Sequence, residues 1–482
     1  MIAELKPYPE YKNSGLPWLG QVPGHWEARR LRHASDMRVS NVDKHTKPGE
    51  TPVRLCNYVE VYKNERIRES TRFMAASATE DERVRFGLRM DDVLITKDSE
   101  QWNDIGVSAL VEFESPDLVC GYHLAILRPR PGLQGPFLHR ALQCHYIAAQ
   151  FHVEANGVTR YGLSHGAIQG IAIPIPPPAE QAAIVRFLNW ANGRLERAIR
   201  AKRKVIALLN EQKQAIVHRA VTRGLDPTVP LKPSGIPWLG DIPQHWEVRR
   251  IKYLLREVNE RSTTGFEPLL SMRMYHGLVL FADHFTRPPQ AATLVGFKLV
   301  HPGQFVVNRM QAGNGVIFAS TLNGLVSPDY AVFNPIGDAN VEFLGELFRS
   351  PKVRAKFRAE SKGLGTGSSG FMRLYNDRLG AIHIALPSCA EQSGILAGLA
   401  GELSGVNTAI SRLEREIELL GEYRARLVAD VVTGKLDVRE AAARLPEAAD
   451  QPEALDDCEA LFEGDEGNAG GDHDAAPEEN EA

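Results

Sequence analysis

The sequence is poor in cysteine and has no long apolar run. Its five cysteines are scattered, odd in number and never spaced as C-x-x-C, which argues against a disulfide framework and a cysteine-rich zinc site. No apolar run approaches the roughly 18 residues that a membrane helix needs, and the N-terminal MIAELKPYPEYKNSG lacks the apolar stretch of a signal peptide. With 482 residues, 43% apolar and 24% charged, the chain is expected to be a soluble cytoplasmic protein of several domains.

The motifs of common catalytic sites are also missing. The sequence has no P-loop, no dinucleotide-binding glycine loop, no H-E-x-x-H and no G-x-S-x-G. The segment SPDY at 327–330 lacks the paired prolines of the amino-methyltransferase loop, and we interpret it as a turn that enters a strand. His25 and His245 each precede a tryptophan, and we interpret both as structural. These absences together favour a chain that is not an enzyme and holds no metal.

Negative charge is concentrated at one end of the chain. From Glu440 to Ala482 there are fifteen acidic residues and one basic residue, Arg444, for a net charge of −14, whereas the preceding residues carry 55 basic and 45 acidic side chains. The acidic segment is rich in glycine and alanine, which predicts disorder. We interpret it as a solubility tail; the alternative is that it repels DNA. The mildly basic remainder permits a nucleic-acid partner.

One motif occurs twice. Residues 14–27 read SGLPWLGQVPGHWE and residues 234–247 read SGIPWLGDIPQHWE, with ten of fourteen positions identical at an offset of 220. Four of the six tryptophans lie in these two copies. A period above 200 residues predicts two whole domains in tandem rather than a solenoid of short repeats.

A second pair of segments marks the start of two helices. AEQAAIVRFL begins at Ala179 after the run PIPPP, and AEQSGILAGL begins at Ala390 after ALPSC, at an offset of 211. Together the two pairs predict an internal duplication with a pseudo-two-fold axis. The predicted parts are a first domain at 14–176, a long helix at 177–226, a second domain at 227–387, a second long helix at 388–437 and the acidic disordered tail at 438–482.

Each long helix carries an apolar seam whose positions alternate four and three apart, as in a coiled coil. The first seam comprises Ile184, Leu188, Ala191, Leu195, Ala198, Lys202, Val205, Leu209, Gln212 and Ile216. The second comprises Leu399, Leu403, Val406, Ile410, Leu413, Ile417, Leu420, Arg424, Leu427 and Val431. We predict that the two helices pair as an antiparallel coiled coil; the alternative is that each packs only on its own domain.

Glycines are frequent in the first turns of the second helix. They weaken these turns by up to about 1 kcal/mol each relative to alanine, so either the turns approach another segment closely or they fray. The four glycines are Gly394, Gly398, Gly401 and Gly405.

The segments before the helices are predicted to be mixed α/β domains. Short stretches typical of strands occur at 93–96, 107–113 and 124–127, and again at 305–308, 316–319 and 330–333. Helical patterns follow at 137–151 and 341–357. The elements recur in the same order although the two domains share few residues. We therefore predict an α+β fold in which two mixed α/β domains are separated by two long helices.

These repeated motifs resemble the specificity subunit of Type I restriction–modification systems, over about residues 14–437. The resemblance rests on SGxPWLGxxPxHWE before each domain and on A-E-Q at the start of each helix. It implies two target-recognition domains, each reading one half of a bipartite, asymmetric site in double-stranded DNA. It also implies that the helices act as a spacer and dock two adenine-N6 methyltransferase (M) subunits, which two restriction (R) subunits then join.

The resemblance further implies that the chain itself catalyses nothing and binds no cofactor directly. S-adenosylmethionine would belong to the M subunits, and ATP and Mg²⁺ to the R subunits. Two other classes stay open at this point. The chain could be a non-catalytic coiled-coil scaffold that does not touch DNA, or an enzyme such as a nuclease with an unrecognised site.

Candidate base-reading residues are polar and basic side chains at the ends of predicted strands and in a matched loop near the end of each domain. Arginine can bind guanine through two hydrogen bonds, and asparagine or glutamine can bind adenine. In the first domain the candidates are Lys97, Gln101, Asn103, Arg160 and Tyr161, and in the second they are Arg309, Gln311, Asn314 and Arg373. Arg160 and Tyr161 belong to a loop at 156–161 that matches a loop at 369–373. The alternative for each residue is a phosphate contact or a solvated side chain.

Overall fold

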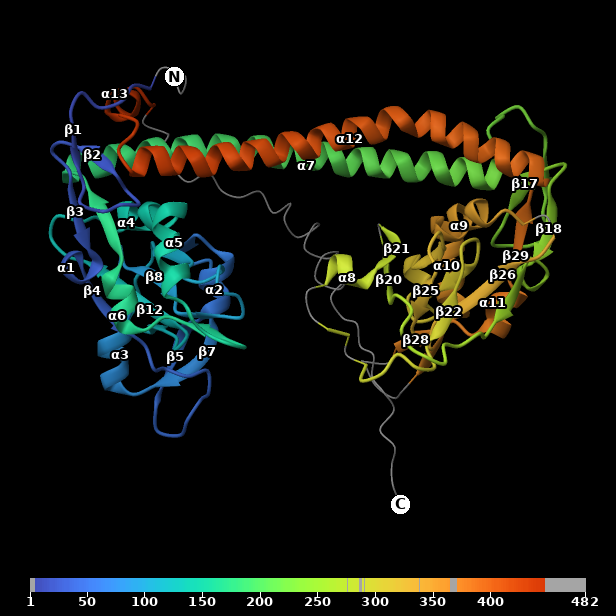
Figure 1. The fold of residues 1–482 in the computed structure, drawn as a ribbon, viewed down its shortest axis with the longest axis horizontal. Helices are drawn as coiled ribbons and strands as arrows, with labels where there is room; N and C mark the ends of the chain where they lie inside the picture. Colours follow the sequence, from blue (N-terminus) through green and yellow to red (C-terminus); the bar gives the residue numbers. More distant parts are fainter. Residues whose placement is uncertain are drawn as a thin grey trace. The chain divides into compact units, whose positions relative to one another are not determined.

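The computed structural model describes residues 5–274, 276–285, 288–289, 291–337, 339–364 and 371–446. Tertiary contacts group the chain into two units: unit 1 takes Met1–Lys202 and Glu414–Ala454, and unit 2 takes Arg203–Leu413. Two long helices, α7 (Pro178–Arg223) and α12 (Cys389–Val432), cross the boundary (Figure 1). Each unit therefore holds one α/β domain together with part of each long helix.

Unit 1 contains the first domain, with strands and helices mixed along the chain. These elements are β1 Tyr11–Asn13, β2 Gln21–Pro23, β3 Glu27–Arg30, α1 Leu31–Ala34, β4 Ser35–Val39, β5 Thr51–Cys56, α2 Tyr58–Lys63, β6 Arg66–Ile67, β7 Met74–Ala78, α3 Glu80–Phe86, β8 Val93–Thr96, β9 Asp98–Ser99, β10 Ser108–Val111, β11 Leu118–Cys120, β12 Leu124–Pro129, α4 Gly135–Leu142, α5 His145–Glu154, β13 Asn156–Gly157, β14 Tyr161–Gly162, α6 His165–Gly170 and β15 Ala172–Ile175.

The central sheet of the first domain has the strand order β4-β12-β8-β10-β6. Its pairs are antiparallel except β10 with β6. All four residues of β8 are buried because both faces of the sheet are covered. One face packs on α4, α5 and parts of both long helices, and the other packs on the three-stranded sheet β11-β5-β7.

Unit 2 repeats this order with shorter strands. Its elements are β16 Leu231–Pro233, β17 Asp241–Pro243, β18 Glu247–Arg250, the 3₁₀ turn η2 Ile251–Tyr253, β19 Leu255–Val258, β20 Leu270–Arg273, β21 Gly277–Leu280, α8 Phe281–His284, β22 Lys298–Val300, β23 Phe305–Val307, η3 Ala312–Asn314, β24 Ile317–Ala319, β25 Gly324–Val326, β26 Ala331–Pro335, α9 Val341–Arg349, α10 Pro351–Glu360, β27 Lys362–Leu364, β28 Phe371–Arg373, α11 Asn376–Ala381 and β29 His383–Leu386. Its main sheet, β19-β26-β23-β24, has the same order as β4-β12-β8-β10. The predicted α+β class is thus confirmed at the level of mixed helix and strand content.

The helical patterns at 137–151 and 341–357 each form two helices rather than one, which corrects the sequence interpretation. In the second domain, Pro351 starts α10, and Ser350 before it has extended dihedral angles (φ −64°, ψ 145°). A residue that precedes proline is disfavoured in the α region, so the helix must end there. In the first domain, Cys144 has extended angles between α4 and α5 without a proline to mark the break.

Within unit 1, the long helices run antiparallel. Glu196 on α7 accepts a hydrogen bond from Arg424 on α12 at 2.8 Å, and nearly two turns further along α7, Lys202 donates to Glu416 at 2.5 Å. As the number rises along α7 it falls along α12. The end of α12 also contributes apolar side chains to the core on which α4 and α5 pack.

Within unit 2 the direction is the same. Lys213 donates to Asn407 at 2.9 Å and Arg219 donates to Glu402 at 3.2 Å. Two predicted seam positions are wrong in α7: Val205, which is 44% exposed, and Gln212, which is also exposed, whereas their neighbours Ile206 and Lys213 are half-buried. The seam therefore shifts by one residue, because alternating steps of three and four could be read from either position.

The glycines of α12 differ in their surroundings. A Cβ atom on Gly398 would lie 2.3 Å from Leu225 Cδ1, so this close approach would require the Leu225 side chain to move if residue 398 were not glycine. Cβ atoms on Gly394, Gly401 and Gly405 would meet no atom within 4 Å in the described part of the chain. Since the helix is regular from Cys389 onward, close approach accounts for one of the four glycines.

The repeated motifs form a joint between each domain and its helix. In unit 1, Trp26 is fully buried, and its Nε1 donates to Glu180 Oε2 at 3.1 Å. His25 Nε2 lies 2.7 Å from the same carboxylate oxygen. The H-W pair of the first motif is therefore linked to the A-E-Q motif of the helix through one buried carboxylate, that of Glu180. These contacts confirm the structural interpretation of His25.

The second copy makes the same joint. Trp246 Nε1 donates to Glu391 Oε1 at 2.9 Å, and His245 Nε2 lies 2.8 Å from Glu391 Oε2. The glutamine that follows each glutamate is fully buried and bonds to backbone groups of its own domain. Gln181 donates to the Gly132 and Pro176 carbonyls, and Gln392 donates to that of Pro387.

Residues 438–446, which the sequence places in the acidic tail, are part of unit 1. They contain α13 (Arg439–Ala443), and Val438, Ala441 and Ala442 are buried in the first domain's core. Asp437 forms an isolated β-bridge with Lys6. The apolar V-x-x-A-A pattern carries this segment into the core in spite of the acidic residues after it. The rest of the predicted tail, 447–482, lies outside the described residues.

Candidate nucleic-acid interface

Two predicted residues of the first domain meet around one carboxylate, and a third lies on the neighbouring strand. Arg160 Nη2 donates to Asp98 Oδ1 at 2.7 Å, and Lys97 Nζ lies 3.8 Å from Asp98 Oδ2. Tyr161 on β14 faces Ser99 on β9 in an antiparallel pair. Arg160 remains 58% exposed in its side chain while Asp98 is 16% exposed. The carboxylate thus holds one end of the guanidinium and leaves the remainder accessible to a ligand.

Gln101 and Asn103 are exposed in the turn that follows β9. The turn is fixed by a hydrogen bond from the Gln101 backbone N–H to Ser99 Oγ at 3.2 Å. Between the two polar residues, Trp102 is 53% exposed and meets His152 edge-on. The exposed tryptophan ring can pack against a flat apolar face of a partner, while the amide side chains on either side can bond to its polar groups.

The aromatic residues of this surface were not predicted from the sequence. His123 Nδ1 lies 2.8 Å from the Asp98 carboxylate, and its ring meets Tyr58 edge-on. Tyr58 stacks on Tyr62, whose hydroxyl donates to Asp104 and whose pKa this hydrogen bond raises to about 12. These residues come from α2 and from the turn before β12, so no local spacing in the sequence joins them to Arg160.

In the second domain two predicted arginines meet at the SPDY turn. Arg309 Nε donates to the Asp329 carbonyl at 2.7 Å, and Arg373 Nη2 donates to the Asp329 carboxylate at 3.2 Å. Burial, and then the charge of Arg373, lower the pKa of Arg309. Lys298, whose pKa burial and Arg309 also lower, donates to the Tyr330 carbonyl. The turn interpretation of this segment is confirmed, because β26 begins directly after it.

The other predicted residues of the second domain lie in and beside η3. Asn314 Nδ2 donates to Gln311 Oε1 at 3.3 Å, and Asn314 is exposed. Of the loop matched to 156–161, Ser369 and Gly370 lie outside the described residues. The second domain therefore presents basic side chains around a turn, where the first presents an arginine beside aromatic rings.

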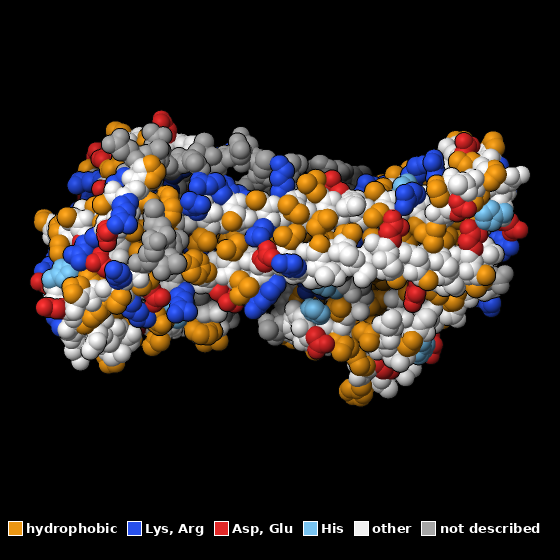
Figure 2. Space-filling model, turned by 90° about the horizontal axis from the view of Figure 1, so that it is seen from above, with side chains coloured by type: hydrophobic (Ala, Val, Ile, Leu, Met, Phe, Trp, Pro, Cys, Tyr) orange, Lys and Arg blue, Asp and Glu red, His pale blue; other side chains and the backbone are white. Residues whose placement is uncertain are grey.

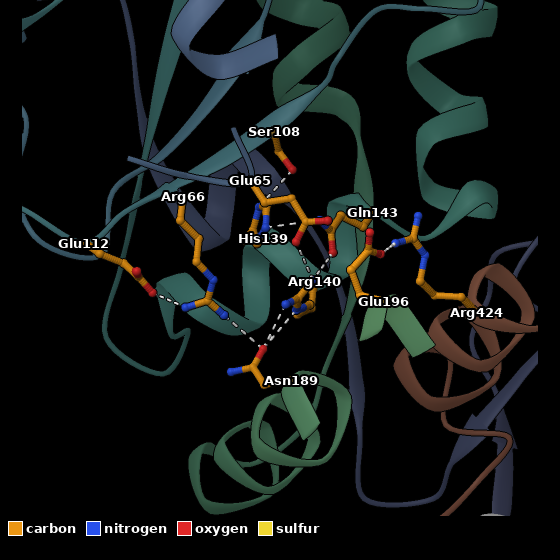
Figure 3. A network of polar contacts seen from close by, with 10 residues as sticks. All are labelled: Glu65, Arg66, Ser108, Glu112, His139, Arg140, Gln143, Asn189, Glu196 and Arg424. Atoms are coloured by element: carbon orange, nitrogen blue, oxygen red, sulfur yellow. Dashed lines mark hydrogen bonds and ion pairs between the residues drawn. The ribbon is translucent and has the colours of Figure 1, made fainter. Parts of the chain in front are cut away.

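A buried polar network fixes the first domain to α7 (Figure 3). Arg140 is 4% exposed, and its Nη2 donates to Asn189 Oδ1 at 2.9 Å. Arg66 Nη2 donates to the same oxygen at 3.1 Å, so one helix residue accepts from two arginines of the domain. Glu65 pairs with Arg140 at 3.1 Å, and Glu112 pairs with Arg66. The charges of both guanidinium groups are thereby compensated.

His139 lies in the same network as a neutral ring (Figure 3). Its ring nitrogens lie 3.1 Å from Ser108 Oγ and 3.2 Å from Gln143 Nε2. Burial, together with the neighbouring charge of Arg140, lowers the pKa of His139 well below its usual range. Because the Gln143 amide nitrogen can only donate, His139 Nε2 accepts and its Nδ1 carries the proton.

The second domain has no such attachment in the described part of the chain. Aligning α9 with α4 through their Phe-Leu pairs puts Glu346 at the position of Arg140, and the helix offset puts Ala400 at that of Asn189. Glu346 instead accepts from Arg349 at 2.6 Å on its own helix. The two copies therefore share the Trp–Glu joint and differ in how the domain meets its helix further along.

These features define the class of protein as a duplicated α/β chain that carries a different polar surface on each of two similar frames. Among the described residues no three His, Cys, Asp or Glu side chains are grouped as metal ligands. None of the described helices combines the length and hydrophobicity of a membrane-spanning segment. No family model matches the chain.

One curated protein is similar to part of this chain. A curated protein of Methanocaldococcus jannaschii, named as the specificity subunit of the type I restriction enzyme MjaX, is 22% identical over 250 residues, which cover 52% of this chain and 56% of that protein. The match thus spans little more than half of the relative's length. The comparison confirms the resemblance to Type I specificity subunits that the repeated motifs indicate.

One solved structure agrees with this chain in fold. A chain from a structure described as showing complex assembly and conformational transition of the type I R-M system is 16% identical, covers 86% of this chain and 99% of its own length, and has a TM-score of 0.55. The HsdS subunit from Thermoanaerobacter tengcongensis, also 16% identical, covers 86% of this chain and 98% of its own length with a TM-score of 0.42.

Proposed function

We propose that this chain is the specificity subunit of a Type I restriction–modification complex, and that each of its α/β domains reads one half of a bipartite, asymmetric site in double-stranded DNA. The observation that carries the proposal is the contrast between the two copies. Their Trp–Glu joints have the same hydrogen bonds, while the exposed residues around Arg160 and around Asp329 differ in composition. Two similar frames with different surfaces suit the recognition of two different half-sites.

In this proposal the two target-recognition domains are separated by the antiparallel pair α7 and α12 and are related by a pseudo-two-fold axis. The pair acts as a spacer between half-sites. Half-sites read from one side of a duplex lie about 34–36 Å apart for each turn of DNA. A helix that rises about 1.5 Å per residue can set such a distance.

The long helices also serve, in this proposal, to dock two M subunits, which two R subunits then join. Apolar side chains exposed on the helices support a protein partner (Figure 2). On α7, Val205 and Leu208 are 44% and 55% exposed, and on α12, Leu419 and Tyr423 are 46% and 41% exposed. Contiguous apolar patches mark interaction sites, and in this proposal these two neighbouring pairs of side chains are the part of each helix that a partner covers.

The chain itself would catalyse nothing and bind no cofactor directly. S-adenosylmethionine would be held by the M subunits, and ATP and Mg²⁺ by the R subunits, in the cytoplasm. The proposed role of Arg160 is to bind a base edge with the part of its guanidinium that Asp98 leaves free. Arg309, which bonds to a backbone carbonyl, is proposed to position the Ser327–Tyr330 turn rather than to read a base itself.

A genome-wide map of N6-methyladenine, with and without this gene in cells that retain their M subunit, tests the proposal. We expect deletion to remove one bipartite, asymmetric methylated motif. An unchanged map, with the M subunit expressed, would favour the scaffold alternative. The isolated chain is expected to bind DNA more weakly as salt rises and not to cut it with Mg²⁺; cleavage would favour the nuclease alternative.

A further inference from the structure

Unit 2 contains a cavity of about 220 Å³ where the end of α7 meets the second domain. The Trp238 ring and the aliphatic chains of Val353 and Ile384 form part of its wall. The charged and titratable side chains that line it are His218, Arg219, Arg223, Lys352 and Asp241. Basic groups thus outnumber the one acidic group at this cavity.

The positive charge is only partly compensated. Arg219 pairs with Glu402 at 3.2 Å. In the part of the chain that the structure describes, Arg223 and Lys352 have no ion pair. The Nδ1 atom of His218 is buried there without a hydrogen-bond partner. His218, Arg223 and Lys352 line the same cavity, and burial, followed by the charges of Lys352 and Arg223, lowers the pKa of His218.

The N-terminus of α10 adds to the positive charge at this cavity. Lys352 and Val353 occupy the first turn of α10 and line the cavity. The N-cap Ser350 makes no side-chain capping bond, and its buried Oγ has no hydrogen-bond partner among the described residues. First-turn N–H groups have no partner within their helix and carry partial positive charge.

The corresponding place in unit 1 has opposite chemistry. The helix offset puts Asp430 where unit 2 has Arg219, and Gly434 where it has Arg223. Asp430 pairs there with Lys435 at 3.4 Å, and the same lysine lies over the Tyr146 ring at 5.1 Å. The charge is therefore balanced within the first copy, and the excess of positive charge belongs to the second copy alone.

We propose that this cavity is a binding site for a small phosphoryl anion of the size of orthophosphate or pyrophosphate. Arg223 and Lys352 would supply the charge, and the first turn of α10 would supply further donors. A phosphoryl group has enough oxygens to use donors from several directions, and arginine binds it through two hydrogen bonds. A volume of about 220 Å³ lies below the roughly 300–1,000 Å³ of sites for drug-sized ligands, so the ligand is a small anion rather than a whole nucleotide.

Calorimetric titration of the full chain with sodium phosphate and with sodium pyrophosphate, at an ionic strength held constant with NaCl, tests this proposal. We expect saturable binding of one anion per chain. Replacing both cations, in an Arg223→Gln, Lys352→Gln variant, should weaken binding at least about tenfold. The matched control is Arg426→Gln, which removes an arginine that is 83% exposed in unit 1 and should leave the affinity unchanged.

Two further readouts distinguish this site from nonspecific attraction of anions and from a DNA contact. Bound anion should raise the pKa of His218, followed by NMR and assigned with a His218→Gln variant, because the anion offsets the two neighbouring cations. DNA affinity should be the same in the double variant as in the native chain. Absence of saturable binding, or equal binding by the double variant, would overturn the proposal. So would a double variant that loses DNA affinity while the native chain binds no free phosphate, since the cations would then be DNA contacts.

Discussion

The two Trp–Glu joints allow one substitution to be tested against its own internal copy. Glu180→Ala removes the acceptor of Trp26 Nε1 in unit 1, and Glu391→Ala removes the acceptor of Trp246 Nε1 in unit 2. Both tryptophans are fully buried. The carboxylates differ, since the Glu180 side chain is 5% exposed and that of Glu391 is 29% exposed.

This difference in exposure sets the expected cost. A buried donor left without an acceptor costs about 1–3 kcal/mol. Water cannot easily replace the Glu180 carboxylate, so we expect Glu180→Ala to cost about 2 kcal/mol or more. Water can reach the place of the Glu391 carboxylate, so we expect about 1 kcal/mol or less there. For units of about 150–250 residues, each kcal/mol corresponds to about 2–4 °C in Tm.

The measurement must report each unit by itself, because a chain with two units need not unfold in one step. Scanning calorimetry gives the transitions, and hydrogen exchange of peptides containing Trp26 or Trp246 assigns each to its unit. Glu180→Gln, which keeps one acceptor oxygen, should recover more than half of the loss. Equal losses for the two alanine variants, or a larger loss for Glu391→Ala, would refute the argument from burial.

Four further predictions concern the helices and the first domain. Arg160→Ala should relax one position of the methylated motif by about 1–3 kcal/mol of discrimination; an equal loss at all sequences would make it a phosphate contact. Glu196→Arg should lower stability by about 0.5 kcal/mol, and adding Arg424→Glu should restore it; a double-mutant cycle without coupling would contradict the antiparallel pair. Because the pKa of His139 is depressed in the folded chain, unfolding takes up a proton below about pH 6.5. The free energy of unfolding should therefore fall as the pH is lowered below that value, by up to about 1.4 kcal/mol per pH unit. In urea titrations, His139→Gln should flatten this part of the pH profile. Matched four-residue insertions in α7 and α12 should add about 6 Å, or two base pairs, to the spacer; a motif of unchanged spacing would rule out the ruler.

Much of the frame could be predicted from the sequence because it depends on local patterns. The stretch Val93–Thr96 is a strand in the structure with the predicted bounds, since four consecutive β-branched or aliphatic residues allow little else. The long helices were visible from their seams, and their ends lie within a few residues of the predicted ones. The break at Cys144 was not predictable, because no proline or glycine marks it.

The candidate interface was predictable only in part, for a different reason. Arg160 was predicted because it lies in a loop that matches one in the second copy and because arginine can bind guanine, but its partners Asp98 and His123 reach it through strand pairing and a turn elsewhere in the chain. In the sequence, Tyr58 and Tyr62 are ordinary helix residues. Only the fold brings Tyr58 against His123, with Tyr62 stacked on Tyr58. The sequence offered no signal for the network at Asn189, whose single oxygen accepts from Arg66 and Arg140.

The division between repeated and divergent residues follows from what each has to contact. Glu180 and Glu391 must each accept from a buried tryptophan, and few other residue types could do so at that position. Strand residues such as those of β8 and β23 need only be apolar, so they could diverge without loss of the sheet. The contacts of exposed residues such as Arg160 do not require the same residue type in both copies. Internal repetition therefore marks the joints that hold this protein together, and the residues that would distinguish one half-site from the other are found where the two copies differ.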